Sequence, residues 1–347
     1  MGKEAAKTGP LARRPDNSAF MQQRLPAWSP MLTASTVLPF MYCMSVLCLL
    51  LGVRLSTYVH FLSQMDYTEA GTCNNCFKVL QTFSDVSCKC KVVFALEKAF
   101  KGDVFFYYGL QNFHQNLRKY MDSRDDAQMV GRKQNLKNPS SYCEPYIMDG
   151  GLPIAPCGAV ANSMFNDSFS LRYHGRRGSE PVPLYRNGIA WYTDENVKFR
   201  NPHLDNQTLA QAFEGTTKPP YWRKPVYDLD EGSSSNNGFI NEDLIVWMRE
   251  AAFPNFKKLY GILKRTDGVF ARGLPAGNYS LDIAYNFPVQ HFKGRKEVVL
   301  STVTWLGGQN HFLPIAYLVT SGLVMLIAIV LTVIWWKFGR KGKNMEE

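Results

Sequence analysis

The chain has 347 residues, 46% of them hydrophobic, and a formal net charge of +10 at pH 7. Nine of its 39 Lys and Arg residues and four of its 29 Asp and Glu residues lie in residues 1–30 and 337–347, which leaves 30 basic against 25 acidic residues elsewhere. This near-balance argues against a nucleic-acid-binding protein, because such a protein needs a concentrated basic surface.

Residues 31–53 form the first of two uncharged, apolar runs. Its 23 residues would reach roughly 35 Å as a helix, which is enough to cross a hydrocarbon layer of about 30 Å. Lys and Arg outnumber Asp and Glu in the preceding residues 1–30, so the positive-inside rule predicts a cytoplasmic N-terminal tail. The run is too long for the core of a cleaved signal peptide, and we therefore predict a retained signal anchor.

Two of the eight cysteines lie within this run, and the other six follow it. The six are Cys73, Cys76, Cys88, Cys90, Cys143 and Cys157. An even number of cysteines in an oxidising compartment predicts disulfides. A zinc site made by the first four is the alternative, but the Cys88-x-Cys90 spacing is tight for one metal ion. We therefore expect no metal site.

Six cysteines allow fifteen pairings. If residues 73–90 form an antiparallel turn, opposed positions have a nearly constant sum of residue numbers. This condition favours nested bonds over crossed ones and leaves the last two cysteines to close a loop of about 15 residues, worth roughly 3 kcal/mol in the chain-entropy model. The favoured pairs are Cys73–Cys90, Cys76–Cys88 and Cys143–Cys157.

Three Asn-x-Ser/Thr sequons fall in the same central region. They are at Asn166, Asn206 and Asn278. Each is a predicted N-glycosylation site if the region faces the secretory lumen. Asn138 is excluded because proline follows it.

The predicted secondary structure of the central region is mainly β. Residues 91–94, 104–108, 278–287 and 297–305 are predicted strands, and the last two are expected to pair with each other. Helical patterns are fewer. Residues 113–121 have apolar side chains at helical spacing, and Asn241 is a plausible N-cap for a helix that runs to residue 252. An antiparallel, sandwich-like domain with short helices is therefore expected.

Residues 312–336 form the second uncharged apolar run, which predicts a second transmembrane helix. Two spans place both ends on one side, so residues 337–347 are a predicted cytoplasmic tail whose basic residues touch anionic membrane lipids. Residues 54–311 then form one exoplasmic or luminal ectodomain. The predicted fold class is a membrane α+β protein with two helices bracketing a disulfide-bonded, β-rich domain.

Motifs for catalysis are absent from the sequence. There is no GxSxG elbow, no GxxxxGK[ST] loop, no GxGxxG turn and no HExxH pair. Asp228, Asp230 and Glu231 resemble a calcium loop only loosely, since Gly232 comes too early, and we interpret them as a solvated loop. We expect neither an active site nor a cofactor.

Several long strings are characteristic of a known family. They include LEKAFKGDVFFYYGLQNFHQNLRKYMDSRDD (96–126), PIAPCGAVANSMFND (153–167), GIAWYTDENVKFRNP (188–202), GTTKPPYW (215–222) and NNGFINEDLIVWMR (236–249). With them the chain resembles, from residue 14 to about 336, the accessory or beta subunits of type IV P-type ATPases, the phospholipid flippases. The resemblance implies a heterodimer with a catalytic alpha subunit, support for its folding and exit from the endoplasmic reticulum, and aminophospholipid translocation.

The resemblance also implies where the chain acts and which residues matter. It implies residence in the endoplasmic reticulum, the Golgi and secretory vesicles, and the plasma membrane. It implies the same three disulfides and a glycan at Asn166. The expected cytoplasmic contacts with the partner come from Arg14, Pro15, Asp16, Asn17, Phe20, Arg24 and Trp28.

One alternative from another class of protein remains open on the sequence alone. Subunits of trimeric ligand-gated channels also have two spans and a cysteine-rich ectodomain. The uncharged spans count against a channel, because ion pathways normally need polar or ionisable groups at membrane depth.

Overall fold

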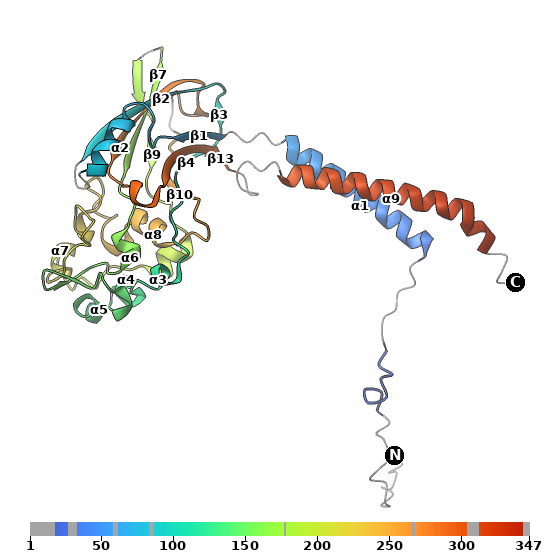
Figure 1. Ribbon diagram of the computed structural model, residues 1–347, viewed down its shortest axis with the longest axis horizontal. Coiled ribbons are helices and arrows are strands. Elements are labelled where there is room, and N and C mark those ends of the chain that lie inside the picture. The colour runs from blue at the N-terminus through green and yellow to red at the C-terminus, as the bar shows by residue number, and fades with distance from the viewer. Residues whose placement is uncertain are drawn as a thin grey trace, which may run out of the picture. The chain divides into compact units, whose positions relative to one another are not determined.

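The structure is a computed structural model that describes residues 18–26, 33–57, 62–82, 87–176, 178–265, 268–303 and 312–342 (Figure 1). The chain divides into two compact units. One unit comprises Met1–Tyr58 and His311–Glu347, and the other comprises Val59–Asn310. We call the second unit the ectodomain, after the location predicted above for residues 54–311.

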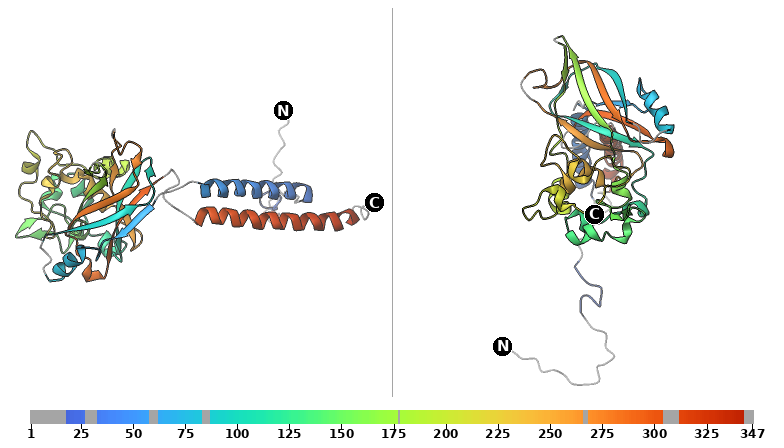
Figure 2. Two further views of the ribbon diagram at one scale, coloured as in Figure 1. Left: turned by 90° about the horizontal axis from the view of Figure 1, so that it is seen from above. Right: turned by 90° about the vertical axis from the view of Figure 1, so that its left-hand side faces the viewer.

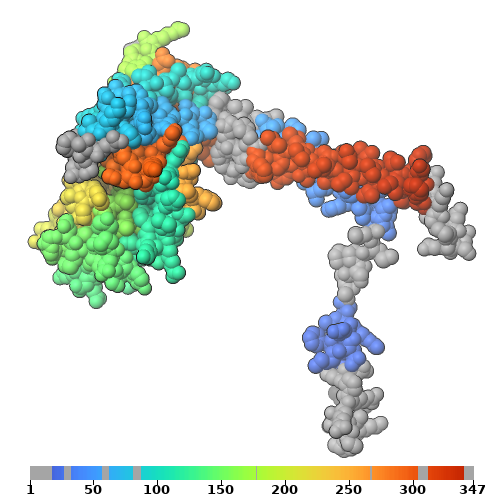
Figure 3. Space-filling view, in the orientation of Figure 1, coloured from blue at the N-terminus to red at the C-terminus, as the bar shows by residue number. Residues whose placement is uncertain are grey.

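The first unit is a pair of long antiparallel helices, α1 (Ala34–Thr57) and α9 (Phe312–Gly342), which lie side by side (Figure 2). Both are long and apolar enough to cross a membrane. Their side chains meet along much of their length in the space-filling view (Figure 3).

Small and hydroxyl-bearing residues hold the two helices together. The Ser45 hydroxyl donates to the Ser321 carbonyl oxygen at 3.0 Å, and the Ser321 hydroxyl donates to the Ser45 carbonyl oxygen at 2.8 Å. A Cβ on Gly52 would lie 2.9 Å from the Leu318 Cγ, so this glycine permits the close approach. In lipid the hydrophobic effect does not drive helices together, so helices usually pack through small residues and hydroxyl hydrogen bonds.

Two antiparallel sheets form the ectodomain. The strand order in the four-stranded sheet is β2 (Cys88–Leu96), β12 (Gly277–Tyr285), β7 (Ser168–Gly175) and β8 (Gly178–Pro181). In the five-stranded sheet it is β1 (Leu62–Asp66), β13 (Arg295–Thr302), β4 (Val104–Gln111), β10 (Phe256–Leu263) and β9 (Leu184–Tyr185). Two-stranded ribbons pair β3 (Phe100–Lys101) with β11 (Gly273–Leu274) and β5 (Met148–Asp149) with β6 (Leu152–Pro153).

Aromatic side chains from both large sheets meet in the core. The Phe169 ring of β7 lies 5.4 Å from the Phe106 ring of β4 and 4.9 Å from the Tyr260 ring of β10, measured between centroids. Such tilted and edge-to-face contacts stabilise beyond the apolar area they bury. The two sheets therefore pack face to face, which confirms the predicted antiparallel, sandwich-like class.

The short helices, except α2, lie in the lower half of the ectodomain as it is drawn in Figure 1. They are α2 (Cys73–Thr82), α3 (Arg118–Met121), α4 (Asp126–Met129), α5 (Lys133–Lys137), α6 (Ala159–Asn162), α7 (Leu209–Ala212) and α8 (Glu242–Met248). Asn241 caps α8 as predicted, because its side-chain oxygen accepts from the Leu244 amide at 3.0 Å.

Lys258 determines where α8 ends. Its ammonium donates to the carbonyl oxygens of Val246, Trp247 and Arg249 at 2.8, 2.8 and 2.6 Å. A cation at a helix C-terminus satisfies carbonyls that lack intrahelical partners and complements the helix dipole. The helix therefore stops at Met248 and not at the predicted residue 252.

Two other expectations were wrong. β12 and β13 are strands, but they lie in different sheets, because residues 286–294 between them form a long connection with a 3-10 turn in place of a tight hairpin. Of the predicted helix at 113–121, only Arg118–Met121 is helical. The Phe113 amide bonds instead to the Pro254 carbonyl, which ties this segment to the approach to β10.

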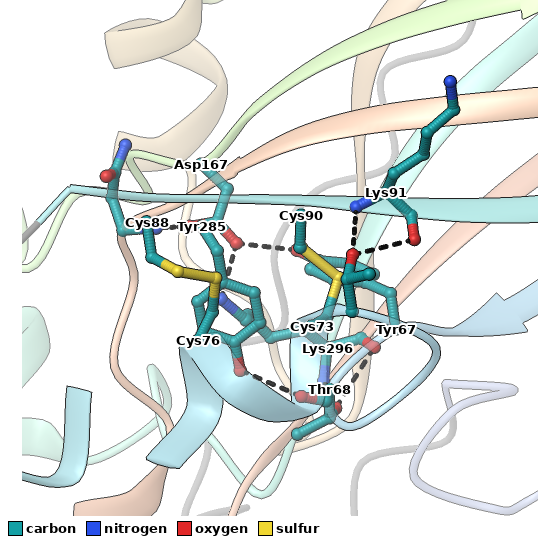
Figure 4. The surroundings of a disulfide bond; sticks show 12 residues. Tyr67, Thr68, Cys73, Cys76, Cys88, Cys90, Lys91, Asp167, Tyr285 and Lys296 are labelled. Atoms are coloured by element: carbon teal, nitrogen blue, oxygen red, sulfur yellow. Dashed lines mark hydrogen bonds and ion pairs between the residues drawn. A yellow bond between two sulfur atoms is a disulfide. The ribbon is translucent and has the colours of Figure 1, made fainter. Parts of the chain in front are cut away.

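A buried ion pair joins the two sheets. Asp167, which directly precedes β7, lies 2.6 Å from the ammonium of Lys296 in β13, and both side chains are 0% exposed. The Tyr67 hydroxyl donates to the same carboxylate oxygen (Figure 4). The other oxygen of Asp167 accepts from the Asn286 and Phe287 amides. Burial lowers the pKa of Lys296 to about 8, and the attraction of Asp167 opposes that shift.

Replacing Asp167 by Asn should destabilise the ectodomain strongly, because Lys296 would have to stay buried without the carboxylate that supports its charge. We expect a loss of about 3 kcal/mol or more in the free energy of unfolding, which corresponds to a thermal midpoint about 10 °C lower. Asp282→Asn is the matched control, since it breaks an exposed pair with Lys91. Thermal unfolding of the full chain in detergent measures both, and equal midpoints for the two variants would contradict the role of the buried pair.

The stability of the ectodomain should also depend on pH through Lys258. Burial lowers the pKa of this group to about 7 in the folded state, against an ordinary value of 10.5. Between these values the unfolded chain holds a proton that the folded chain has released, so stability rises with pH by up to about 1.4 kcal/mol per unit. Lys258→Met should lessen this rise between pH 7 and 9, to which Lys296 also contributes above pH 8, whereas Lys257→Met, at the exposed neighbour, should retain it. The measurement is the thermal midpoint of each variant at pH 7 and pH 9. The same increase in both variants would contradict the role of Lys258.

Candidate functional site: the stapled ectodomain and its exposed side chains

Two disulfides fasten α2 to the edge strand β2. They join Cys73 to Cys90 and Cys76 to Cys88, which is the nested pairing that the sequence favoured (Figure 4). The premise of that prediction was wrong, however, because residues 73–82 form a helix and not one arm of a turn. The pairing is the same because residues three apart in a helix lie on one face, as do residues two apart in a strand. Cys73 and Cys76 can therefore both face Cys88 and Cys90.

The third disulfide, Cys143–Cys157, holds a small satellite of the core. Apart from the two cysteines, Ile154 is the one fully buried apolar residue of this satellite among the residues that the structure describes. Gln128 braces it, because its side chain accepts from the Cys157 amide at 2.9 Å and donates to the Ile154 carbonyl at 3.0 Å. With so little apolar area, the satellite depends on the covalent bond.

A cavity of about 540 Å³ opens between the start of β7, strand β10, helix α8 and the loop at residues 221–232. Its wall includes Tyr108, Asn166, Arg186, Tyr221, Asp243 and Tyr260. Arg186 donates to both carboxylate oxygens of Asp243 at 2.8 and 2.7 Å, and its guanidinium carbon lies 3.4 Å from the Tyr260 ring centroid. Burial raises the pKa of Asp243, although Arg186 opposes that shift.

The acidic loop at Asp228–Glu231 is organised by its own backbone. Asp230 accepts from the Gly232 and Ser233 amides and from the Asn236 side chain, at 2.9, 3.2 and 2.8 Å. Among the residues that the structure describes, no group of three or more His, Cys, Asp or Glu side chains could hold a metal ion. Hydrogen bonds within the loop thus explain how the Asp230 carboxylate is held in place.

All three sequon asparagines are exposed. Asn166 lies at the rim of the cavity, and its neighbours Phe165 and Asp167 are buried. Asn206 has a left-handed backbone conformation with φ of 68° just before α7. Asn278 lies near the start of β12, opposite Ala95 and His174. Glycosylation at each of them stays a prediction.

Exposed aromatic side chains are the strongest candidates for contacts with a partner protein. Trp191, Tyr192 and Phe253 are 65%, 78% and 74% exposed. The Trp191 ring packs against Arg249, whose guanidinium carbon lies 4.2 Å from the ring centroid. Trp222 is different, because it is buried and its indole donates to the Ala161 carbonyl at 2.7 Å.

Of the seven residues predicted to contact a partner in the cytoplasm, the structure describes two. Phe20 and Arg24 lie in a turn in which the Arg24 amide bonds to the Ala19 carbonyl, and both side chains are exposed. The remaining five lie outside the described residues. They are Arg14, Pro15, Asp16, Asn17 and Trp28.

Comparisons with known proteins match nearly the whole chain. The LEM3 (ligand-effect modulator 3) family / CDC50 family matches residues 42–341, from within α1 to within α9. Cell cycle control protein 50A of Mus musculus is 48% identical over 342 residues, which cover 96% of this chain and 91% of that protein. Cell cycle control protein 50B of Homo sapiens is 46% identical over 346 residues, 97% of each.

A plant relative is more distant. ALA-interacting subunit 3 of Arabidopsis thaliana is 34% identical over 330 residues, which cover 93% of this chain and 87% of that protein. The similarity therefore extends over both helices and the stapled ectodomain. The resemblance seen in the sequence is confirmed, and the chain belongs to the LEM3/CDC50 family, the family of flippase accessory subunits.

Proposed function

We propose that this chain is the non-catalytic subunit of a heterodimer with the catalytic alpha subunit of a type IV P-type ATPase. It supports the folding of that subunit, its exit from the endoplasmic reticulum and the translocation of aminophospholipid. The observation that carries this proposal is the family match, which spans both helices and the ectodomain between them. The name of the plant relative describes a subunit that interacts with another component, which is consistent with an accessory role.

The proposed topology follows from the sequence. Residues 1–30 and 337–347 are cytoplasmic, residues 31–53 and 312–336 span the bilayer, and residues 54–311 are exoplasmic or luminal. The two long apolar helices support this arrangement. Such a chain resides in the endoplasmic reticulum, the Golgi and secretory vesicles, and the plasma membrane.

The chain acts on its partner by binding and not by chemistry. Its sequence has no phosphate-binding loop and no phosphorylation segment of a P-type ATPase, so energy comes from the partner. A subunit that binds one conformation of the ATPase more tightly shifts the population toward that conformation. The rigid, disulfide-stapled ectodomain suits this role, because little ordering is needed on binding.

Three parts of the chain are the proposed contacts. The exposed Trp191 and Tyr192 supply aromatic anchors on the ectodomain, since aromatic side chains are enriched at binding hot spots. The outer faces of α1 and α9 pack against a helix of the partner. The segment at residues 14–28, including Phe20 and Arg24, contacts its cytoplasmic loops.

The proposal predicts a one-to-one complex in membranes. Co-expression with candidate type IV P-type ATPases, followed by cross-linking and affinity purification of this chain, should recover one catalytic subunit for each copy. Uptake of labelled phosphatidylserine should rise with complex formation. A homotrimer without an ATPase would support the two-span ligand-gated channel instead.

The Cys143–Cys157 bond should be required for exit from the endoplasmic reticulum. Replacing both cysteines by Ser removes the cross-link from a satellite that has little apolar core, at a cost of about 3 kcal/mol. We expect the double variant to keep glycans sensitive to endoglycosidase H and to be absent from the cell surface. The control replaces Cys43 and Cys48 of α1, which are not in disulfides, and should traffic normally.

A further inference from the structure

One feature of the ectodomain that the proposed function does not use is the cavity whose rim holds Asn166. Its volume of about 540 Å³ falls within the range of about 300–1,000 Å³ that is typical of small-ligand sites. Neither disulfide bonding nor the proposed partner contacts need such a cavity. We therefore ask which ligand this cavity could bind.

Aromatic and charged groups share the wall of the cavity. Tyr221 lines the wall and is 64% exposed, so its side chain is accessible to a ligand that enters the cavity. Tyr260 is buried and lies under the Arg186–Asp243 pair. Arg223 and Glu231 line the wall as well and offer donors and acceptors in the same space. A ligand with an apolar face and many hydroxyl or amide groups fits this mixture, and a carbohydrate has that chemistry.

A predicted glycosylation site lies at the edge of this cavity. Asn166 begins the sequon Asn-Asp-Ser, and its side chain is exposed. The residue is held firmly: Phe165 stacks on Tyr108 with 4.0 Å between ring centroids, and Asp167 is anchored by the buried ion pair. The Asn286 side chain also donates to the Asn166 carbonyl at 3.0 Å. The first sugar of a glycan on Asn166 would thus be attached at a fixed position.

We propose that this cavity seats the inner N-acetylglucosamine residues of a glycan on Asn166, with the first ring stacked on Tyr221. Attachment makes the binding intramolecular, so even a weak contact is populated, because the effective concentration of a tethered ligand is high. The proposal rests on the predicted exoplasmic placement of the ectodomain. It does not require any particular ATPase partner.

The test measures how fast the Asn166 glycan is removed from the folded chain. A parent chain with Asn206→Gln and Asn278→Gln keeps one sequon. The full chain is made in a eukaryotic secretory host, purified in detergent and digested with peptide-N-glycosidase F without denaturation. Tyr221→Ala should speed release about fivefold, equivalent to about 1 kcal/mol of lost contact.

Two matched variants separate the stacking contact from a general effect. Tyr221→Phe keeps the ring and should release the glycan at the rate of the parent. Tyr142→Ala removes a tyrosine side chain of similar exposure (71%) that does not line the cavity, and should also leave the rate unchanged. Equal rates for the parent and Tyr221→Ala would overturn the proposal, as would a parent chain whose Asn166 carries no glycan. Recovery of an ATPase in the co-expression experiment is independent of either result.

Discussion

The Asp167–Lys296 pair is the interaction on which the ectodomain depends. One carboxylate, with its two oxygens, holds an ammonium from one sheet, a tyrosine hydroxyl, and two backbone amides that follow β12 in the other sheet. A buried charge is tolerated only when it is paired and its remaining hydrogen-bonding capacity is used. The pair therefore fixes how the two sheets face each other, and with them the start of β7, where Asn166 lies.

Elsewhere in the ectodomain, a few specific bonds likewise hold short elements in place. Two disulfides hold α2 against an edge strand, one holds a satellite that has almost no core, and one lysine ends α8 by binding three carbonyls. Each device positions a short element that could not be stable alone. The resulting domain presents exposed aromatic side chains, which is consistent with the proposed role as an accessory subunit.

The sequence was reliable where a local rule applies and unreliable where distant segments compete. The N-cap at Asn241 follows from a hydrogen bond three residues away, so it could be read from the sequence. The end of α8 could not, because the lysine that ends it comes from β10. The predicted pairing of β12 with β13 failed for a similar reason: two good strands in sequence order need not be partners when each can be central in its own sheet.

The sequence by itself determined the two apolar helices, the β-rich domain between them and the family, since hydrophobic length, alternation and long matching strings are all local properties. The tertiary structure alone decided which strands share a sheet, that Trp222 is buried while Trp191 is exposed, and that Asn166 borders a cavity. Those facts depend on contacts between residues far apart in the chain. No local pattern encodes them, because the same side chain has a different environment in each possible packing.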